Sequence, residues 1–544
     1  MKNTNTLLSI TNLKKYFPVA KTKLFQKEQL YVRANEEITI DIQNGETFGL
    51  VGESGCGKST LGRTILQLYD QTAGSTIYYG RTLDEFAPSY VLNTLKGWRK
   101  HIALYNKKQQ KATQLQEELE AAGEGATFFQ HQSANLAAAE ARTAFDNIVK
   151  LMGGIVSLQD PERGVRLLID RFRQQSRLCK LEEQARDLEA EIATQKAIAA
   201  ELEQDTSDKK NASLAQKARS AAAGYTRKLE ALQPVLQAAK KRVDSANEAL
   251  AEYKAQFADD PTFKEYEEKL DNGIDLSRLK YSEMRILRKD IQIIFQDPYS
   301  SLNPRMTIGQ IIGEGLTTHK FFKPRDPKMK DYILKVMDQC GLQDYMLHRY
   351  PHQFSGGQRQ RICIARALAV KPKFIVCDEC VSALDVSIQS QIINLLEELK
   401  EKENLTYLFI SHDLSVVRYI SDRIGVMYLG NMVELGSAEE VFSDPRHPYT
   451  VALLSSIPTT DPDSANKERI LLEGNIPSPI KPPDGCKFHT RCYMACDKCK
   501  RVPPPTVEIA PGHFVACHFP EKKLGEKGEY LFKVSDRESS DGNL

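Results

Sequence analysis

A glycine-rich segment near the start of the chain carries the residue types that bind phosphate groups. Its residues are Gly52, Glu53, Ser54, Gly55, Cys56, Gly57, Lys58, Ser59 and Thr60. Glycines let backbone N–H groups curl around phosphate oxygens because no Cβ stands in the way. Lys58 offers a charge to the β- and γ-phosphates, and the Ser59 hydroxyl offers a ligand to Mg²⁺. An apolar strand pattern precedes the segment and a helical pattern follows it, so we expect a nucleotide site at a helix N-terminus.

Two adjacent carboxylates, Asp378 and Glu379, follow the apolar stretch 374–377. A buried strand seldom ends in paired acids unless a cation or a reacting water needs them. We expect Asp378 to hold the Mg²⁺ shell and Glu379 to polarise the attacking water.

A third motif opens a predicted helix between these two. Its residues are Ser355, Gly356, Gly357 and Gln358. A hydroxyl, free amides and the helix dipole then point the same way, which predicts a second place for an anion.

In this order the motifs resemble the ABC ATPase family, whose signature is SGGQ. The resemblance implies a nucleotide-sensing glutamine at Gln296, a D-loop aspartate at Asp385 and a switch histidine at His412. It also implies an aromatic residue that stacks on adenine, which we assign to Tyr16, with Phe17 and Tyr31 nearby.

Three further segments, 296–312, 446–458 and 476–492, look like the ATPases of dipeptide, oligopeptide and nickel importers. The form of the phosphate loop is more like the second of the two paralogous ATPases that such systems pair. The resemblance implies ATP hydrolysis that drives peptide import at the cytoplasmic face of the membrane. The implied partners are a paralogous ATPase in a heterodimer, two transmembrane permeases and an extracytoplasmic substrate-binding protein, with no nucleic acid.

The resemblance also covers a cysteine-rich segment near the end of the chain. Cys486, Cys492, Cys499 and Cys517 fit the family's iron–sulfur ligand spacing, and Cys496 is an additional thiol. Four thiolates suit a [4Fe–4S] cluster or a tetrahedral zinc, and unligated reduced thiols are the remaining alternative. Losing a ligand is expected to destabilise this region and to leave nucleotide binding intact, because the phosphate loop lies far away in sequence.

The stretch 81–272 is rich in Ala, Glu, Gln and Lys and contains two apolar seams of 3-4 spacing. The first seam has Leu181, Ala185, Leu188, Ile192, Ala199 and Leu202, and the second has Leu229, Leu232, Leu236, Ala239, Val243, Ala246, Leu250, Tyr253 and Phe257. They predict an antiparallel coiled-coil hairpin, with separate solvated helices as the alternative. Arms of about 30 residues would reach on the order of 45 Å. Pro234 should kink the returning arm near its start.

The fold class is predicted to be α/β, with a mixed sheet core and a helical signature subdomain. We expect an ABC nucleotide-binding domain at 1–80 and 273–440, the coiled-coil insert at 81–272, a small Cys-rich C-terminal domain at 441–524 and a mobile tail at 525–544. The sequence contains no apolar run of about 18 residues, so a membrane role is expected to need separate membrane proteins.

A non-transport ABC ATPase of the DNA-repair or chromosome-structuring kind is the alternative function, because those proteins also carry a long coiled coil. They insert it after the Q-loop, whereas the predicted coil here precedes Gln296. The net charge of +2 over 544 residues gives no overall basic field for nucleic acid. Transport is therefore the favoured function.

Overall fold

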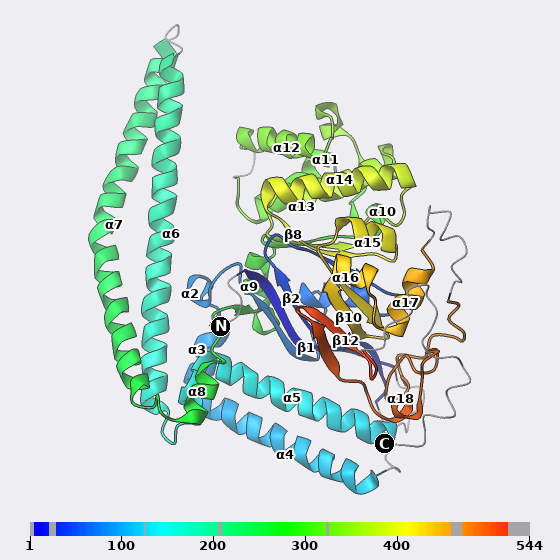
Figure 1. Cartoon of the computed structure of the whole chain (residues 1–544). Helices are drawn as coiled ribbons and strands as arrows, with labels where there is room; N and C mark the ends of the chain where they lie inside the picture. Colours follow the sequence, from blue (N-terminus) through cyan, green and yellow to red (C-terminus); the bar gives the residue numbers. More distant parts are fainter. Residues whose placement is uncertain are drawn as a thin grey trace. The chain divides into compact units, whose positions relative to one another are not determined.

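The computed structural model describes residues 5–20, 29–123, 127–204, 209–322, 326–457 and 470–520. Two compact units divide the chain (Figure 1). The helical unit comprises Arg81–Glu117 and Glu140–Ile274, and the sheet unit comprises the described parts of Lys2–Gly80, Glu118–Ala139 and Asp275–Leu544. The predicted tail at 525–544 lies outside the described residues.

The larger sheet of the sheet unit positions most of the candidate site. Its strands, in spatial order, are β11 (Thr506–Ala510), β12 (His513–Ala516), β10 (Asn431–Ser437), β9 (Arg423–Tyr428), β3 (Thr47–Val51), β8 (Thr406–Ile410), β7 (Phe374–Asp378) and β6 (Ile291–Ile294). Pairing is parallel from β9 to β6 and antiparallel among β9, β10, β12 and β11. Every residue of β3, β7 and β8 is buried, as expected for parallel strands covered on both faces.

The smaller sheet has the strand order β2-β1-β4-β5. Its bounds are β1 (Thr6–Pro18), β2 (Tyr31–Gln43), β4 (Ala73–Tyr78) and β5 (Ile274–Asp275). β1 pairs antiparallel with both β2 and β4. The chain leaves this sheet after β4 and returns to it at β5, so the long insertion interrupts one sheet between two neighbouring strands.

Helices accompany the strands of the sheet unit, and most of them share one apolar core with the larger sheet. They are α1 (Lys58–Ile65), α9 (Tyr281–Leu287), α10 (Pro298–Ser301), α11 (Ile308–Thr318), α12 (Pro327–Gln339), α13 (Gly356–Leu368), α14 (Val386–Glu403), α15 (Leu414–Ile420), α16 (Ala438–Ser443), α17 (Pro448–Ser455) and α18 (Asp497–Arg501). Ile312 of α11, Met337 of α12 and Ile362 of α13 are fully buried in that core. The helical region that carries the SGGQ motif is therefore anchored to the strands.

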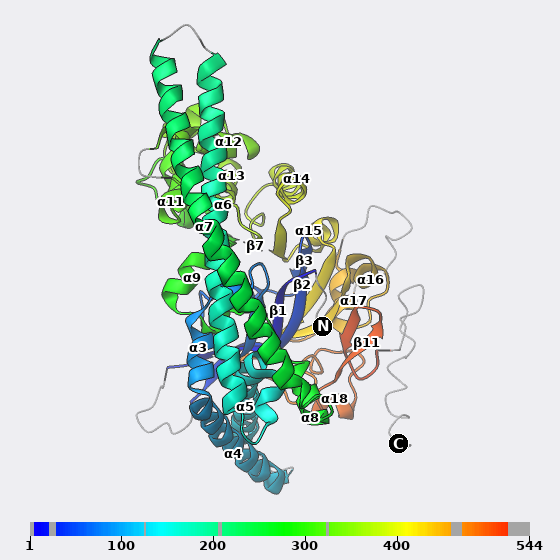
Figure 2. The same cartoon turned by 90° about the vertical axis from the view of Figure 1, so that its left-hand side faces the viewer.

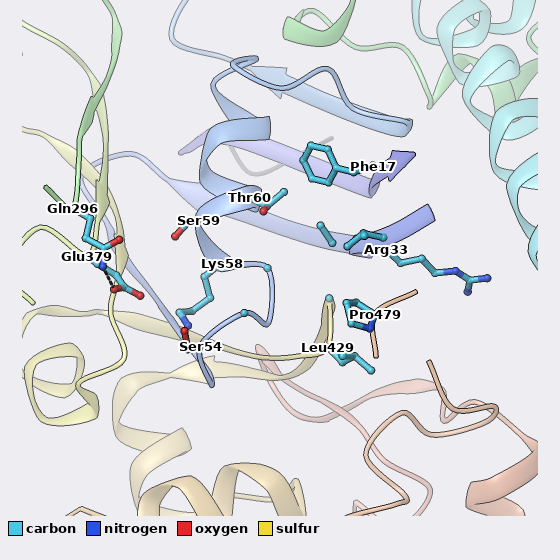
Figure 3. Close-up of a pocket in the computed structure, with 15 residues that line it drawn as sticks. Phe17, Arg33, Ser54, Lys58, Ser59, Thr60, Gln296, Glu379, Leu429 and Pro479 are labelled. Atoms are coloured by element: carbon cyan, nitrogen blue, oxygen red, sulfur yellow. Dashed lines mark hydrogen bonds between the residues drawn. The ribbon is translucent and has the colours of Figure 1, made fainter. Parts of the chain in front are cut away.

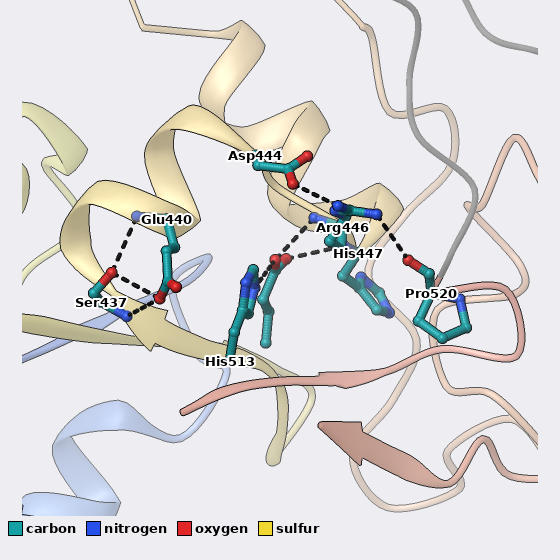
Figure 4. Close-up of polar contacts among 8 residues, drawn as sticks. Ser437, Glu440, Asp444, Arg446, His447, His513 and Pro520 are labelled. Carbon is teal, nitrogen blue, oxygen red and sulfur yellow. Dashed lines mark hydrogen bonds and ion pairs between the residues drawn. The ribbon is translucent and has the colours of Figure 1, made fainter. Parts of the chain in front are cut away.

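The C-terminal region, which was expected to begin at 441, contributes a strand to the larger sheet. β12 extends this sheet by pairing with β10, and both strands belong to the sheet unit. Glu434 of β10 is 1% exposed and accepts hydrogen bonds from the backbone N–H groups of Arg446 and His447. Its carboxylate also lies 2.9 Å from Nε2 of His513 on β12. Figure 4 shows Arg446, His447 and His513 close to one another.

The helical unit contains two long antiparallel helices, α6 (Glu162–Gln204) and α7 (Lys209–Ala255), which run side by side (Figure 2). Its described part also contains α2 (Leu83–Phe86), α3 (Ser89–Lys96), α8 (Pro261–Glu267) and most of α4 (Trp98–Ala122) and α5 (Phe128–Met152). None of the described helices is both long and apolar enough to span a bilayer.

The seam between α6 and α7 uses residues that the 3-4 pattern singled out. Buried there are Ala185, Leu236, Ala239 and Val243, together with Leu178 from outside the predicted set. The exposed ion pairs Lys240–Glu182 and Arg219–Glu203 join the two helices in the same antiparallel register. α6 has 43 residues and α7 has 47, so each spans roughly 65 to 70 Å, more than the expected arm. Because α7 begins at Lys209, Pro234 lies near its middle, and the prediction of a position near its start is wrong.

Candidate functional site

One pocket of the sheet unit brings together six predicted residues of the phosphate loop with Gln296 and Glu379 (Figure 3). Its lining residues are Phe17, Val32, Arg33, Ala34, Ser54, Gly55, Gly57, Lys58, Ser59, Thr60, Gln296, Glu379, Leu429, Gly430 and Pro479. The phosphate loop forms its floor, Gln296 and Glu379 stand at one end, and Phe17, Leu429 and Pro479 stand toward the other.

The phosphate loop joins β3 to α1, as the sequence predicted. Gly57 has φ 102°, and a Cβ on it would lie 2.1 Å from the carbonyl oxygen of Ala34, so only glycine fits there. Lys58 is 4% exposed and donates hydrogen bonds to the carbonyl oxygens of Gly52 at 2.7 Å and Glu53 at 3.2 Å. These bonds hold its amine inside the curl of the loop.

Two residues of the loop do not line the pocket, although we predicted that they contact the nucleotide. Gly52 contributes its carbonyl oxygen to Lys58. Cys56 is 5% exposed, and burial raises the pKa of its thiol. Gly52 and Cys56 therefore support the conformation of the loop without lining the pocket.

The second group of site residues lies at the carboxyl ends of β6, β7 and β8. Gln296 donates a hydrogen bond from Nε2 to Oε2 of Glu379 at 2.8 Å. Nδ1 of His412 lies 3.6 Å from the same oxygen. Glu379 has φ 49°, and its N–H donates to the carbonyl oxygen of Ile410 at the end of β8. Gln296 and His412, which are distant in sequence, thus converge on the carboxylate of Glu379.

Asp378 occupies the last position of β7 and is 1% exposed. Its Oδ2 accepts a hydrogen bond from Nη2 of Arg63 at 3.1 Å, whereas the buried Oδ1 has no hydrogen-bond partner among the described residues. A buried carboxylate oxygen left free in this way fits a cation or its water shell. The unpaired Oδ1 of Asp378 therefore fits the prediction for this residue, and Ser59 and Gln296 line the pocket, which Asp378 itself does not line.

The aromatic residue that lines the pocket is Phe17, whereas the predicted Tyr16 does not line it. Successive side chains of a strand point to opposite faces. Tyr16 is 4% exposed and donates its hydroxyl to Glu36, and burial raises the pKa of that hydroxyl. Phe17 faces the pocket (Figure 3).

Sequence reasoning missed the rest of the base end, namely Val32, Arg33, Ala34, Leu429, Gly430 and Pro479. Pro479 is held there because its carbonyl oxygen accepts the N–H of Arg33 at 3.1 Å. Pro479 lies in the segment 476–492, whose resemblance to importer ATPases was the one sequence signal for a C-terminal contribution to the pocket.

The signature residues do not line this pocket. Ser355 caps α13 through a reciprocal pair of hydrogen bonds with Gln358, and Gly356 and Gly357 form the first turn. Asp385 is exposed and caps α14. Both groups are thus ordered helix N-termini on the same unit, outside the nucleotide pocket of their own chain.

Comparison with known proteins agrees with this geometry. The ABC transporter family matches residues 35–273 and 262–382, and the C-terminal region of oligopeptide/dipeptide transporters matches residues 433–499. The oligopeptide transport ATP-binding protein AppF of Bacillus subtilis is 56% identical over 248 residues, which are 45% of this chain and 75% of that protein. This chain belongs to the oligopeptide transporter ATP-binding family of ABC proteins.

Other members of the family are similar to it to nearly the same degree. The oligopeptide transport ATP-binding protein OppF of Haemophilus influenzae is 52% identical over 45% of this chain and 74% of its own length. The ABC ATPase is accordingly an ATP-hydrolysing enzyme of an importer. The DNA-repair alternative is set aside, because a transporter's C-terminal region matches residues 433–499.

The cysteine segment of this ABC ATPase gathers its thiols without forming a site for a single metal ion. No group of three or more His, Cys, Asp or Glu side chains in the described part of the chain could hold one. A [4Fe–4S] cluster and its alternative, a zinc ion, both stay predictions for these cysteines.

The cysteines nevertheless lie close together and receive backbone donors. The N–H of Met494 lies 3.4 Å from Sγ of Cys492, and the N–H of Phe519 lies 3.5 Å from Sγ of Cys517. Burial raises the pKa of Cys492 to about 12, and the thiols of Cys486, Cys517 and Cys499 add to this by their proximity. Ligation by these four residues stays a prediction.

Proposed function

We propose that this ABC ATPase binds and hydrolyses ATP to drive the import of oligopeptides or dipeptides. The observation that carries the proposal is the convergence of Gln296 and His412 on Glu379 beside the phosphate loop. The cargo class rests on the similarity to the oligopeptide transport proteins AppF and OppF.

The hydrolytic step follows from the positions of these groups. Glu379 accepts a proton from water as the water oxygen forms a bond to the γ-phosphorus. The bond from that phosphorus to the β,γ-bridging oxygen breaks, and ADP and phosphate leave. Gln296 and His412 hold the Glu379 carboxylate in place, and Lys58 holds the β- and γ-phosphates. Ser59, Asp378 and Gln296 would hold Mg²⁺, which would supply charge neutralisation on those phosphates.

A second ATPase subunit completes each site in this proposal. Ser355, Gly356, Gly357, Gln358 and Asp385 lie outside the pocket of their own chain, where a partner's nucleotide can reach them. A paralogous ATPase of the same family is the proposed partner, with this chain as the second paralogue. Two transmembrane permeases and an extracytoplasmic binding protein complete the complex, which places the ABC ATPase at the cytoplasmic face of the membrane.

The test is co-expression of the chain with its candidate permeases and paralogue, followed by peptide uptake into proteoliposomes. ATP-dependent uptake is expected with the native chain. Glu379→Gln is the matched control, because its amide cannot accept the proton from water while Lys58 and Ser59 still bind ATP. It should abolish uptake and trap the two ATPases as a dimer. Native hydrolysis rates in Glu379→Gln would contradict the catalytic role of Glu379. A complex whose ATPase activity is not stimulated by peptide would contradict the proposed peptide cargo.

The four cysteines Cys486, Cys492, Cys499 and Cys517 are proposed to bind a [4Fe–4S] cluster. Support comes from their crowding and from the backbone N–H groups directed at their sulfurs. Anaerobically purified protein should be brown and contain iron and acid-labile sulfide. Cys517→Ser should lose both, whereas Cys496→Ser should retain them. Stoichiometric zinc without iron would contradict the proposal.

A further inference from the structure

The phosphate loop is held from outside by the C-terminal segment. The carboxylate of Glu53 receives both terminal nitrogens of Arg491, at 2.7 Å to Oε2 and 3.0 Å to Oε1. The Arg491 side chain is only 6% exposed. Two parallel bonds between a planar guanidinium and a carboxylate fix orientation as well as distance.

The backbone of Glu53 is held from the same side. Its N–H donates to the hydroxyl of Tyr449 at 2.8 Å, and Tyr449 belongs to α17 in the C-terminal region. On its other side, the Glu53 carbonyl oxygen accepts a hydrogen bond from Lys58 at 3.2 Å. Glu53 therefore connects the C-terminal region directly to the lysine that binds phosphate.

The residues behind this contact are tightly packed. Phe488 is 1% exposed, and its ring centroid lies 5.3 Å from that of Tyr449 and 5.1 Å from that of Tyr428. Phe488 and Arg491 both lie between Cys486 and Cys492, with Arg491 next to Cys492. The N–H of Cys486 in turn donates to the carbonyl oxygen of Cys499 at 2.8 Å. A change at the cysteines can thus reach Glu53 through few contacts.

We propose that Arg491 and Tyr449 are positioning residues of the ATP site, which set the phosphate loop for ATP through Glu53. ATP affinity therefore depends on the fold of the cysteine segment 486–492. The proposal differs from the sequence-based expectation that a cysteine variant would leave nucleotide binding intact. The inference rests on the ATP site alone and is independent of the transported cargo.

The test measures the Kd of the purified chain for a fluorescent ATP analogue, together with its Tm. Arg491→Lys keeps the charge but loses the paired geometry, and it should raise the Kd about tenfold. Tyr449→Phe keeps the ring packing and removes only the acceptor of the Glu53 N–H, so it should raise the Kd by a smaller factor. Glu53→Gln serves as the second variant on the same contact if Arg491→Lys does not fold.

Arg446→Lys is the matched control for Arg491→Lys. Arg446 also lies in the C-terminal region and is ion-paired, but its guanidinium bonds to Asp444 and to the carbonyl oxygen of Pro520 (Figure 4), and neither residue belongs to the phosphate loop. Its substitution should leave the Kd unchanged.

The cysteine arm of the test compares Cys492→Ser with Cys496→Ser. Only the first should weaken ATP binding, because Cys492 adjoins Arg491 and Cys496 does not. A lower Tm with an unchanged Kd in Arg491→Lys and Glu53→Gln would show that the contact only stabilises the fold, and the proposal would fall. An equal rise in Kd for Arg446→Lys would overturn it as well.

Discussion

Tyr16 and Phe17 are neighbours in β1 with opposite surroundings, because a strand sends successive side chains to opposite faces. Tyr16 belongs to the buried polar group around Glu36, and Lys14 donates to the same carboxylate. Phe17 is left on the side of the nucleotide pocket. A shift of one residue along the strand is therefore enough to replace the buried Tyr16 by Phe17, the aromatic residue that lines the pocket.

At this scale the two residues should separate in a binding experiment. Phe17→Ala should weaken ATP binding by about tenfold, since stacking of a base on an aromatic ring contributes about 1 to 3 kcal/mol. Tyr16→Phe keeps the ring and loses only the bond to Glu36, so it should lower Tm and leave the Kd unchanged. Isothermal titration with ATP measures both. Equally weakened ATP binding in Phe17→Ala and Tyr16→Phe would contradict this and would support a contact between Tyr16 and the base.

The start of α17 in the C-terminal region is stabilised by a single side chain, that of His447. His447 precedes this helix, and its Nδ1 accepts the backbone N–H of Tyr449 at 3.1 Å. It is 1% exposed, and burial lowers its pKa to about 4 despite the opposing effect of Glu434. A protonated ring would lose its role as acceptor.

The neutral His447 makes stability depend on pH. Between pH 6.5 and 4, His447 binds a proton in the unfolded chain but stays neutral in the folded chain. The free energy of unfolding therefore falls as pH falls, by roughly 3 kcal/mol in total. Tm measured from pH 7.5 to 5 should therefore decline less in His447→Asn, whose amide can still cap the helix. The exposed His348→Asn is the control and should keep the native decline. An unchanged slope in His447→Asn would contradict the assignment.

The pair α6–α7 is the largest element of the insertion, and its ion pairs allow it to be shortened in register. Replacing residues 191–231 with a short Gly/Ser linker removes the Arg219–Glu203 pair and keeps Lys240–Glu182. We expect unchanged ATP hydrolysis, because long surface insertions cost the fold little, but impaired assembly or uptake. Glu203→Gln, which keeps the full length, is the control. Loss of nucleotide binding in the shortened chain would show that the hairpin belongs to the ATPase core.

On the scale of the whole molecule, the phosphate loop, the acid pair and the long helices could be predicted because each depends on local sequence. Lys58, Glu379, Gln296 and His412 meet in the structure as their motifs indicated. The contribution of Pro479 could not be predicted, since it depends on a backbone bond to Arg33 that no local pattern encodes. The same holds for β12, whose pairing with β10 joins the cysteine-rich region to the ATPase sheet.

That pairing leads to a prediction about truncation. Removing residues 445–544 should leave β10 as an unpaired edge strand and take away the N–H groups and the histidine that surround Glu434. Light scattering should show aggregation of this variant. Removal of residues 525–544 alone is the control and should leave a monodisperse protein. A soluble truncated chain with native ATP affinity would contradict the prediction.

The central position of β3 also has a consequence for the order in which the protein can be made. β3 ends at Val51, yet both of its neighbours, β8 and β9, begin only at Thr406 and Arg423. The hydrogen bond from Gly45 to Thr406 spans 361 residues. On the ribosome, β3 and the phosphate loop emerge long before β8 and β9, so β3 stays unpaired with them while α6 and α7, which pair locally, fold first. The helical insertion lengthens the time before β3 can pair, so this chain should depend on chaperones during synthesis more than a relative without the insertion.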